Sequence, residues 1–194
     1  MLRPNRDPGP RAGILLVTAL GVLAACAPAA STGSGARAPA ADLPPWNGNA
    51  LRADEVPAVY ETAWRAAENR RSCALLAPRT LGTANVALGG ATARVATFAG
   101  GWGIAYDLPG TRSAFGVAGT GALAGEPGTY DQWPHRRRWV DGSQAAYGPE
   151  GGTGPNQLAY VSIPGQRCLY NVWSRLGQAH LESLLEQLRF VDLR

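Results

Sequence analysis

Three kinds of sequence follow one another along the chain: an apolar run, a stretch of small and polar residues, and a longer part with periodic hydrophobic patterns. The apolar run spans residues 12–25 and follows a polar segment that carries Arg3, Arg6 and Arg11. Its fourteen residues are fewer than the roughly 20 that a membrane-spanning helix needs. A basic segment, a short apolar core and small residues at its end are typical of a cleaved export signal.

Helical periodicity appears twice in the patterned part. In residues 54–70, apolar side chains recur three or four positions apart, Asp54 is placed to cap a helix, and Pro57 falls in its first turn. In residues 178–188 the same spacing places four leucines on one face, and we expect Phe190 to pack beyond the end. The leucines are Leu181, Leu184, Leu185 and Leu188. The pattern therefore predicts two amphipathic helices, one near each end of this part.

Between these helices, short apolar segments alternate with Gly- and Pro-rich turns. We predict strands at residues 91–98, 102–107, 113–118, 138–141, 144–147, 158–163 and 168–173. The turn signals are Ala99-Gly100-Gly101, Leu108-Pro109-Gly110 and Pro164-Gly165. A helix, antiparallel hairpins and a second helix predict an α+β fold: a single antiparallel sheet of about five to seven strands, covered by an N-terminal and a C-terminal helix.

Aromatic residues recur along the predicted strands. They are Trp102, Tyr106, Phe115, Tyr147, Tyr160, Tyr170 and Trp173. Such residues are most often core or cross-strand pairs, and the alternative is a ligand groove or a sugar platform. We expect one face of the sheet to meet the helices, while the other face is open.

The four residues Leu23-Ala24-Ala25-Cys26 end the apolar run. They resemble the lipobox of bacterial lipoproteins. The resemblance implies that the Cys26 thiol receives a diacylglyceryl group and that a peptidase cuts between Ala25 and Cys26. Two alternatives remain open: an ordinary export signal cut after Ala24 or Ala25, with Cys26 left as a free thiol, or an uncleaved membrane anchor.

The resemblance divides the chain into a lipoprotein signal peptide at residues 1–25, a lipidated tether at 26–50, and a soluble α+β domain at 51–194. The tether is expected to be disordered, because small, Gly, Ser and Pro residues cannot bury enough surface to order themselves. The implied location is the cell envelope, on the outer face of the cytoplasmic membrane or on the outer membrane. Ala27 is not the aspartate that commonly signals retention at the inner membrane. The closing strand–turn–strand–helix resembles the PsbP-type fold of several exported lipoproteins.

If Cys26 carries lipid, Cys73 and Cys168 remain as one pair. Outside the cytoplasm such a pair usually forms a disulfide. Metal ligation is the alternative, but His135 and His180 are the only histidines, and neither lies at a zinc-site spacing from a cysteine. We therefore predict a disulfide and no metal site.

Charge and glycine spacing exclude two classes of partner. The formal charge is +4, and the first 25 residues hold three of the 18 basic residues and one of the 14 acids, so the mature chain has about +2. A chain so nearly neutral is not expected to bind nucleic acid. Gly116, Gly119, Gly121 and Gly125 do not match G-x-G-x-x-G, so no dinucleotide or other cofactor is predicted.

One cluster suggests a ligand site. Arg136, Arg137 and Arg138 stand between Trp133 and Trp139. Guanidinium groups present planar hydrogen-bond donors and indoles offer a stacking face, so the five side chains are candidates for an anion-binding site. The alternative is a solvated segment that enters a strand, with the tryptophans packed beneath it.

These observations favour a membrane-anchored lipoprotein with a small, non-enzymatic domain that binds an unknown envelope protein or ligand. One alternative is a cell-envelope hydrolase, which would need His135 or His180 beside a serine and a carboxylate. No G-x-S-x-G motif supports it, and His180 is expected at the solvent edge of its helix. The other alternative is a structural or assembly factor of the envelope. No catalytic residue is predicted.

Overall fold

The computed structural model describes residues 42–83, 88–121, 133–152 and 154–194. Within these ranges the fold is α+β, as predicted, and consists mostly of sheet. Its α-helices are α1 (Val59–Ala66) and α2 (Gln178–Gln187), and neither is long and apolar enough to cross a membrane. The strands are β1 (Leu51–Arg52), β2 (Leu76–Pro78), β3 (Thr92–Val95), β4 (Trp102–Leu108), β5 (Thr111–Thr120), β6 (His135–Arg138), β7 (Gln144–Pro149), β8 (Gln157–Ser162), β9 (Leu169–Ser174) and β10 (Leu188–Asp192).

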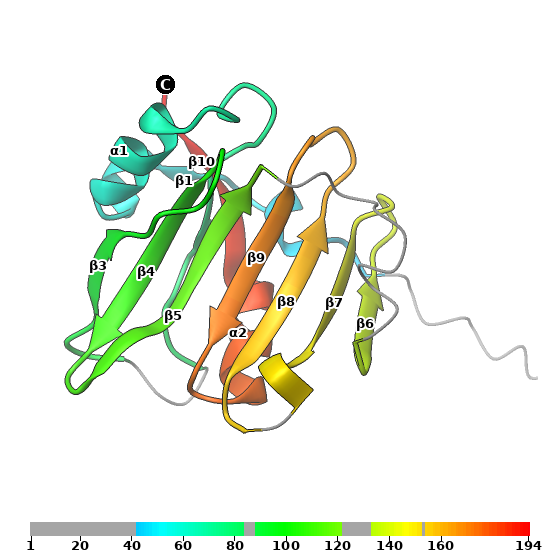
Figure 1. The fold of residues 1–194 in the computed structure, drawn as a ribbon. Helices are drawn as coiled ribbons and strands as arrows, with labels where there is room; N and C mark the ends of the chain where they lie inside the picture. Colours follow the sequence, from blue (N-terminus) through cyan, green and yellow to red (C-terminus); the bar gives the residue numbers. More distant parts are fainter. Residues whose placement is uncertain (1–41, 84–87, 122–132, 153) are drawn as a thin grey trace, which may run out of the picture. The chain divides into compact units, whose positions relative to one another are not determined.

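Seven of these strands form one antiparallel sheet in the order β3-β4-β5-β9-β8-β7-β6 (Figure 1). The turns predicted at Gly100, Gly110 and Gly165 are present, and all three glycines have positive φ angles, which glycine adopts at little cost. The predicted strand positions are confirmed to within a few residues except at 138–141. Strand β6 lies three residues earlier, because Trp139 begins the turn into β7: its amide donates to the Ser143 carbonyl.

A second sheet of three strands, in the order β1-β10-β2, was not predicted, so the expectation of a single sheet is wrong. Strand β10 follows α2 directly and pairs parallel with β1 and antiparallel with β2. As a result α2 is not the last element and α1 is not the first, contrary to the prediction that the helices close the two ends. Strands β1 and β2 have two and three residues, too few to show an alternating pattern in sequence.

Helix α1 is shorter than the predicted helix at residues 54–70. Pro57 explains the late start, because a residue before proline is disfavoured in the helical region. Val56 is extended accordingly, with φ −122° and ψ 154°, and residues 53–55 form a separate 3-10 turn. The helix ends at Ala66, and Ala67, the residue after it, is extended.

Both helices pack on the same face of the seven-stranded sheet. Tyr106 of β4 and Phe115 of β5 are register partners and therefore point to one face. Tyr106 meets Tyr60 of α1, and Phe115 meets His180 of α2. Figure 1 accordingly shows α2 and β10 behind the sheet. We call the opposite side the helix-free face, since neither described helix packs on it.

The core lies between the sheet and the elements on its helix-covered face. All four leucines predicted on one helix face are part of it and are buried, although Leu188 begins β10 instead of ending α2. The largest fully buried side chains are Trp46, Trp102, Tyr60, Tyr170, Phe115, Leu76, Ile104, Leu181, Leu184, Leu188, Val117 and Val161.

The packed domain begins before residue 51, where the predicted tether was expected to end. Trp46 lies in a 3-10 turn (Pro45–Asn47) and is only 2% exposed. Its ring meets that of Trp139, with centroids 4.8 Å apart in an edge-to-face arrangement. Residues 44–50 therefore belong to the folded domain, since a side chain of this size contributes strongly when buried.

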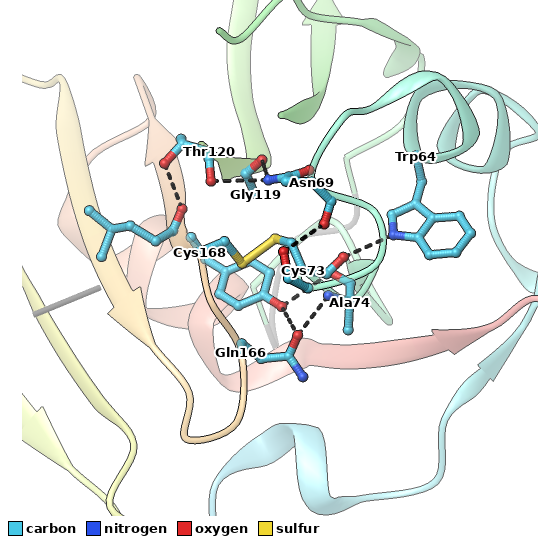
Figure 2. Close-up of a disulfide and its surroundings, with 11 residues drawn as sticks. Trp64, Asn69, Cys73, Ala74, Gly119, Thr120, Gln166 and Cys168 are labelled. Atoms are coloured by element: carbon cyan, nitrogen blue, oxygen red, sulfur yellow. Dashed lines mark hydrogen bonds between the residues drawn. A yellow bond between two sulfur atoms is a disulfide. The ribbon is translucent and has the colours of Figure 1, made fainter. Parts of the chain in front are cut away.

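Cys73 and Cys168 are disulfide-bonded, as predicted, with Cα atoms 5.5 Å apart (Figure 2). The bond joins the segment after α1 to the start of β9, and both cysteines are buried. The side-chain amide of Asn69 holds the same segment on β5 by donating to the carbonyls of Gly119 and Thr120 at 3.1 and 3.0 Å. The disulfide and these hydrogen bonds together fix the connection between α1 and β2 against the sheet.

Candidate functional site

Small residues form the centre of the helix-free face. The register pairs Gly103 with Ala118 and Ala105 with Gly116 across β4 and β5, and Gly148 lies on the same face of β7. All five residues are buried. Glycine inside a strand often marks a place where another group approaches the backbone closely. Side chains from elsewhere in the fold are therefore expected to lie over these glycines.

Aromatic rings cover two of the glycines. A Cβ atom at Gly116 would lie 2.2 Å from the Trp173 ring, and one at Gly103 would lie 2.4 Å from the Phe98 ring. The two rings therefore rest on the backbone of the sheet, with centroids 5.8 Å apart. Both side chains remain partly exposed. The glycines leave room for rings that are supported from below and open above.

A second aromatic pair extends this surface toward β6. The rings of Trp133 and Tyr160 meet edge to face, with centroids 5.5 Å apart. Tyr160 is the register partner of Asn171, which lies two residues before Trp173 on β9. We call the four rings together the aromatic platform; they are Phe98, Trp133, Tyr160 and Trp173.

Two polar atoms at the platform lack a hydrogen-bond partner. Trp133 Nε1 and Asn171 Oδ1 are buried, and neither makes a hydrogen bond within the part of the chain that the structure describes. A buried polar group without a partner costs about 1–3 kcal/mol and calls for an explanation, such as a ligand or water that completes its hydrogen bonds. Trp133 and Asn171 therefore carry one donor and one acceptor that are unpaired but closed to solvent in the unbound domain.

Charged side chains flank the platform at both edges of the sheet. At the β3 edge, Arg94 and Asp107 form an ion pair at 2.9 Å. The Ser113 amide and the Arg94 guanidinium lower the pKa of Asp107. At the β6 edge, Arg136 and Arg138 point to the helix-free face, as their register partners Ala146 and Gln144 do. The platform thus has a weakly polar centre and a basic margin along β6.

The arginine run predicted as an anion site is divided between the two faces of the sheet. Side chains alternate along a strand with a period of two, so three consecutive residues cannot share a face. Arg136 and Arg138 lie on the helix-free face and Arg137 on the helix-covered face. The two tryptophans are also separated: Trp133 belongs to the platform, while Trp139 is buried against Trp46. The five side chains therefore do not form a single anion-binding site.

Arg137 lies instead at a cleft between α2 and strands β6 and β7. The cleft has a volume of about 260 Å³ and is lined by Arg137, Tyr147, Glu182, Leu185 and Glu186. Tyr147 donates to Glu182 at 3.0 Å, and burial together with this carboxylate raises the pKa of Tyr147. Arg137 lies 3.5 Å from both Asp42 and Glu186 and over the Trp139 ring. These groups bind one another, so the platform is the better candidate for a ligand.

The histidines do not form the site that a hydrolase would need. His135 stacks on Tyr147. His180 was expected at the solvent edge of its helix but is 5% exposed. Its Nε2 lies 2.8 Å from the Leu81 carbonyl and must donate, so Nδ1 accepts from Ser174 Oγ at 2.9 Å. Ser174 is itself fully buried, and among the described residues this pair has no carboxylate partner, so its contacts fix α2 on β9.

The burial of His180 gives a pH prediction. Burial lowers the pKa of this imidazole below its ordinary value of 6.5. The unfolded chain therefore binds a proton more readily, and the free energy of unfolding should fall as the pH drops below about 6.5 toward the folded-state pKa. Between pH 7 and 8 this group should have no effect. Urea unfolding of wild type and His180→Gln at pH 7.5 and 5.5 checks this; an equal fall in both proteins would contradict it.

Among the described residues, no group of three or more His, Cys, Asp and Glu side chains is arranged to hold a metal ion. No protein-family model matches the chain, and neither curated proteins nor solved structures gave a significant match. The resemblance to the PsbP-type fold stays a prediction.

Tyr160 and Trp173 were among the strand aromatics predicted as candidates, whereas Phe98 and Asn171 were not predicted as members of the site. The available signal was the glycines within the strands, among them Gly103 of β4 and Gly116 of β5. Only the three-dimensional register places those glycines under the rings.

Proposed function

We propose that this protein is an exported lipoprotein, anchored through lipid on Cys26, whose domain binds a component of the cell envelope on the helix-free face. The lipobox at Leu23–Cys26 supports the anchor. The disulfide between Cys73 and Cys168 supports export, because such bonds persist mainly in oxidising compartments.

The aromatic platform is the observation that carries the binding proposal. An antiparallel sheet covered on one side usually alternates apolar side chains inward with polar side chains outward. Here the outward side carries Phe98, Trp133, Tyr160 and Trp173 over small residues. Aromatic rings that stay partly exposed on one face of a sheet are candidates for an interaction site.

A sedimentation assay tests the binding proposal. The full-length protein, purified in non-ionic detergent, is mixed with detergent-extracted envelope from its host and centrifuged. Trp173→Ala and Tyr160→Ala are each expected to weaken binding at least tenfold, because each removes one ring of the platform. Two separate variants keep the test valid if one folds poorly, and circular dichroism checks the fold of both.

Leu176→Ala is the matched control, because Leu176 is 39% exposed and lies between β9 and α2, outside the sheet. It should bind as wild type does. Unchanged binding by both folded platform variants, or no sedimentation of wild type with the envelope, would refute the proposal.

A further inference from the structure

We infer that the envelope component bound by the platform is an anionic polysaccharide. This inference rests on the proposed function and adds the chemical class of the ligand. It follows from three features of the helix-free face: the supported rings, the neutral hydrogen-bonding groups between them, and the arginines at the β6 margin.

The rings suit the apolar face of a sugar. The electron-rich face of an aromatic ring attracts groups with partial positive charge. The axial C–H groups of a pyranose carry such partial charge and form a flat patch. Trp173 and Phe98 rest on the glycine backbone beneath them, so their orientation is fixed before a ligand arrives. Preorganised groups bind with a smaller loss of conformational entropy.

The polar groups beside the rings suit hydroxyls. Trp133 Nε1 is a donor and Asn171 Oδ1 is an acceptor, and both are buried without a partner. A sugar hydroxyl that reached these atoms would donate to the amide oxygen and accept from the indole. Tyr160 lies between these two residues, through its ring contact with Trp133 and its register pairing with Asn171. Together, a neutral donor and a neutral acceptor match a ligand with many hydroxyl groups better than they match a charged peptide.

The row of residues across the sheet favours an extended ligand. Arg136, Ala146, Tyr160 and Asn171 are successive register partners on β6, β7, β8 and β9. With neighbouring strands about 4.8 Å apart, this row spans roughly 14 Å. A linear polymer can lie along such a row, with sugar rings over the platform and its acidic groups toward the β6 margin. Arg138, exposed on the same face, adds a second guanidinium there.

Pretreatment of the envelope distinguishes the chemical classes. Detergent-extracted host envelope is divided into samples treated with protease, with organic solvent to remove residual lipid, or with periodate, which cleaves the vicinal diols of sugars. Full-length wild-type protein in detergent is then added to each washed sample. Binding is expected to survive protease and solvent and to fall at least tenfold after periodate.

Arg138→Ala tests the charge of the ligand. It should weaken binding several-fold at 50 mM salt and by much less at 500 mM, since salt screens exposed charges. Leu176→Ala should behave as wild type in every sample. Equal affinity of Arg138→Ala and wild type at 50 mM salt would overturn the anionic character of the ligand.

The outcomes separate this inference from the proposed function. Loss of binding after protease with no effect of periodate would identify a protein partner, and loss after solvent would identify a lipid. Either result overturns the polysaccharide and leaves a platform-dependent binding protein in place. Binding that ignores Trp173→Ala and Tyr160→Ala would overturn both.

Discussion

Replacing both Cys73 and Cys168 with Ser is expected to lower the free energy of unfolding by about 4 kcal/mol. The two residues are 95 positions apart, so the bond closes a long loop in the unfolded chain. On the chain-entropy account a loop of about 100 residues corresponds to roughly 4.7 kcal/mol, and removal of a native disulfide typically costs 2–5 kcal/mol. Urea unfolding followed by tryptophan fluorescence measures the loss.

Two controls test whether the loss of unfolding free energy comes from the disulfide itself. Wild-type protein unfolded in the presence of a reducing agent should lose a similar amount, because the same constraint is removed. Reducing agent should have no further effect on the double variant. A double variant within about 1 kcal/mol of oxidised wild type would contradict a role for the bond in holding the segment after α1 on the sheet.

Replacing Trp46 with Ala is expected to cost about 3–5 kcal/mol, the range for removal of a large aromatic side chain from a core. Trp46 is 2% exposed, and its contact with Trp139 joins the start of the domain to the end of β6. The same unfolding assay measures the effect.

Leu43→Ala is the control for Trp46, because Leu43 is three residues away and 72% exposed. It should change the unfolding free energy by less than about 0.5 kcal/mol, as surface substitutions usually do. If Trp46→Ala were equally mild, the folded domain would begin after residue 50, as the composition of the segment had suggested.

Much of the fold could be predicted from patterns that depend on near neighbours. Helix α2 was predicted at nearly its observed length because its leucines repeat at helical spacing. The hairpins could be predicted because glycines mark their turns. Gly110 and Gly165 adopt the positive φ angles that favour glycine. The number of cysteines, together with the predicted export signal, was enough to predict the disulfide.

Features that depend on distant partners could not be predicted in this way. Strand β10 forms where the chain after α2 pairs with β2, and no periodicity in residues 188–192 predicts this pairing. His180 occupies a position in α2 that looked solvent-facing, yet the Leu81 carbonyl and Ser174 enclose it. The three arginines of β6 suggested one cluster in sequence because their strand had been placed three residues too late. Once the strand is in register, alternation separates them.

The candidate site, too, could be predicted from the sequence only in part. Aromatic residues in the strands were visible, and an open sheet face was expected, but the members of the platform were not identified as a set. Phe98 lies in the loop between β3 and β4, outside any strand, so strand alternation does not predict that its ring lies over Gly103. Pairing of Tyr160 with Asn171 requires the register of β8 and β9.

The proposed anchor at Cys26 would place this domain in the envelope, and it is tested most directly by the intact mass of the protein isolated from the membranes of its host. The account predicts a chain that begins at residue 26 and carries the added mass of a diacylglyceryl group, with or without a further acyl chain on the amino terminus. A chain that retains Met1, or one that begins at residue 26 without added fatty-acid mass, would contradict it.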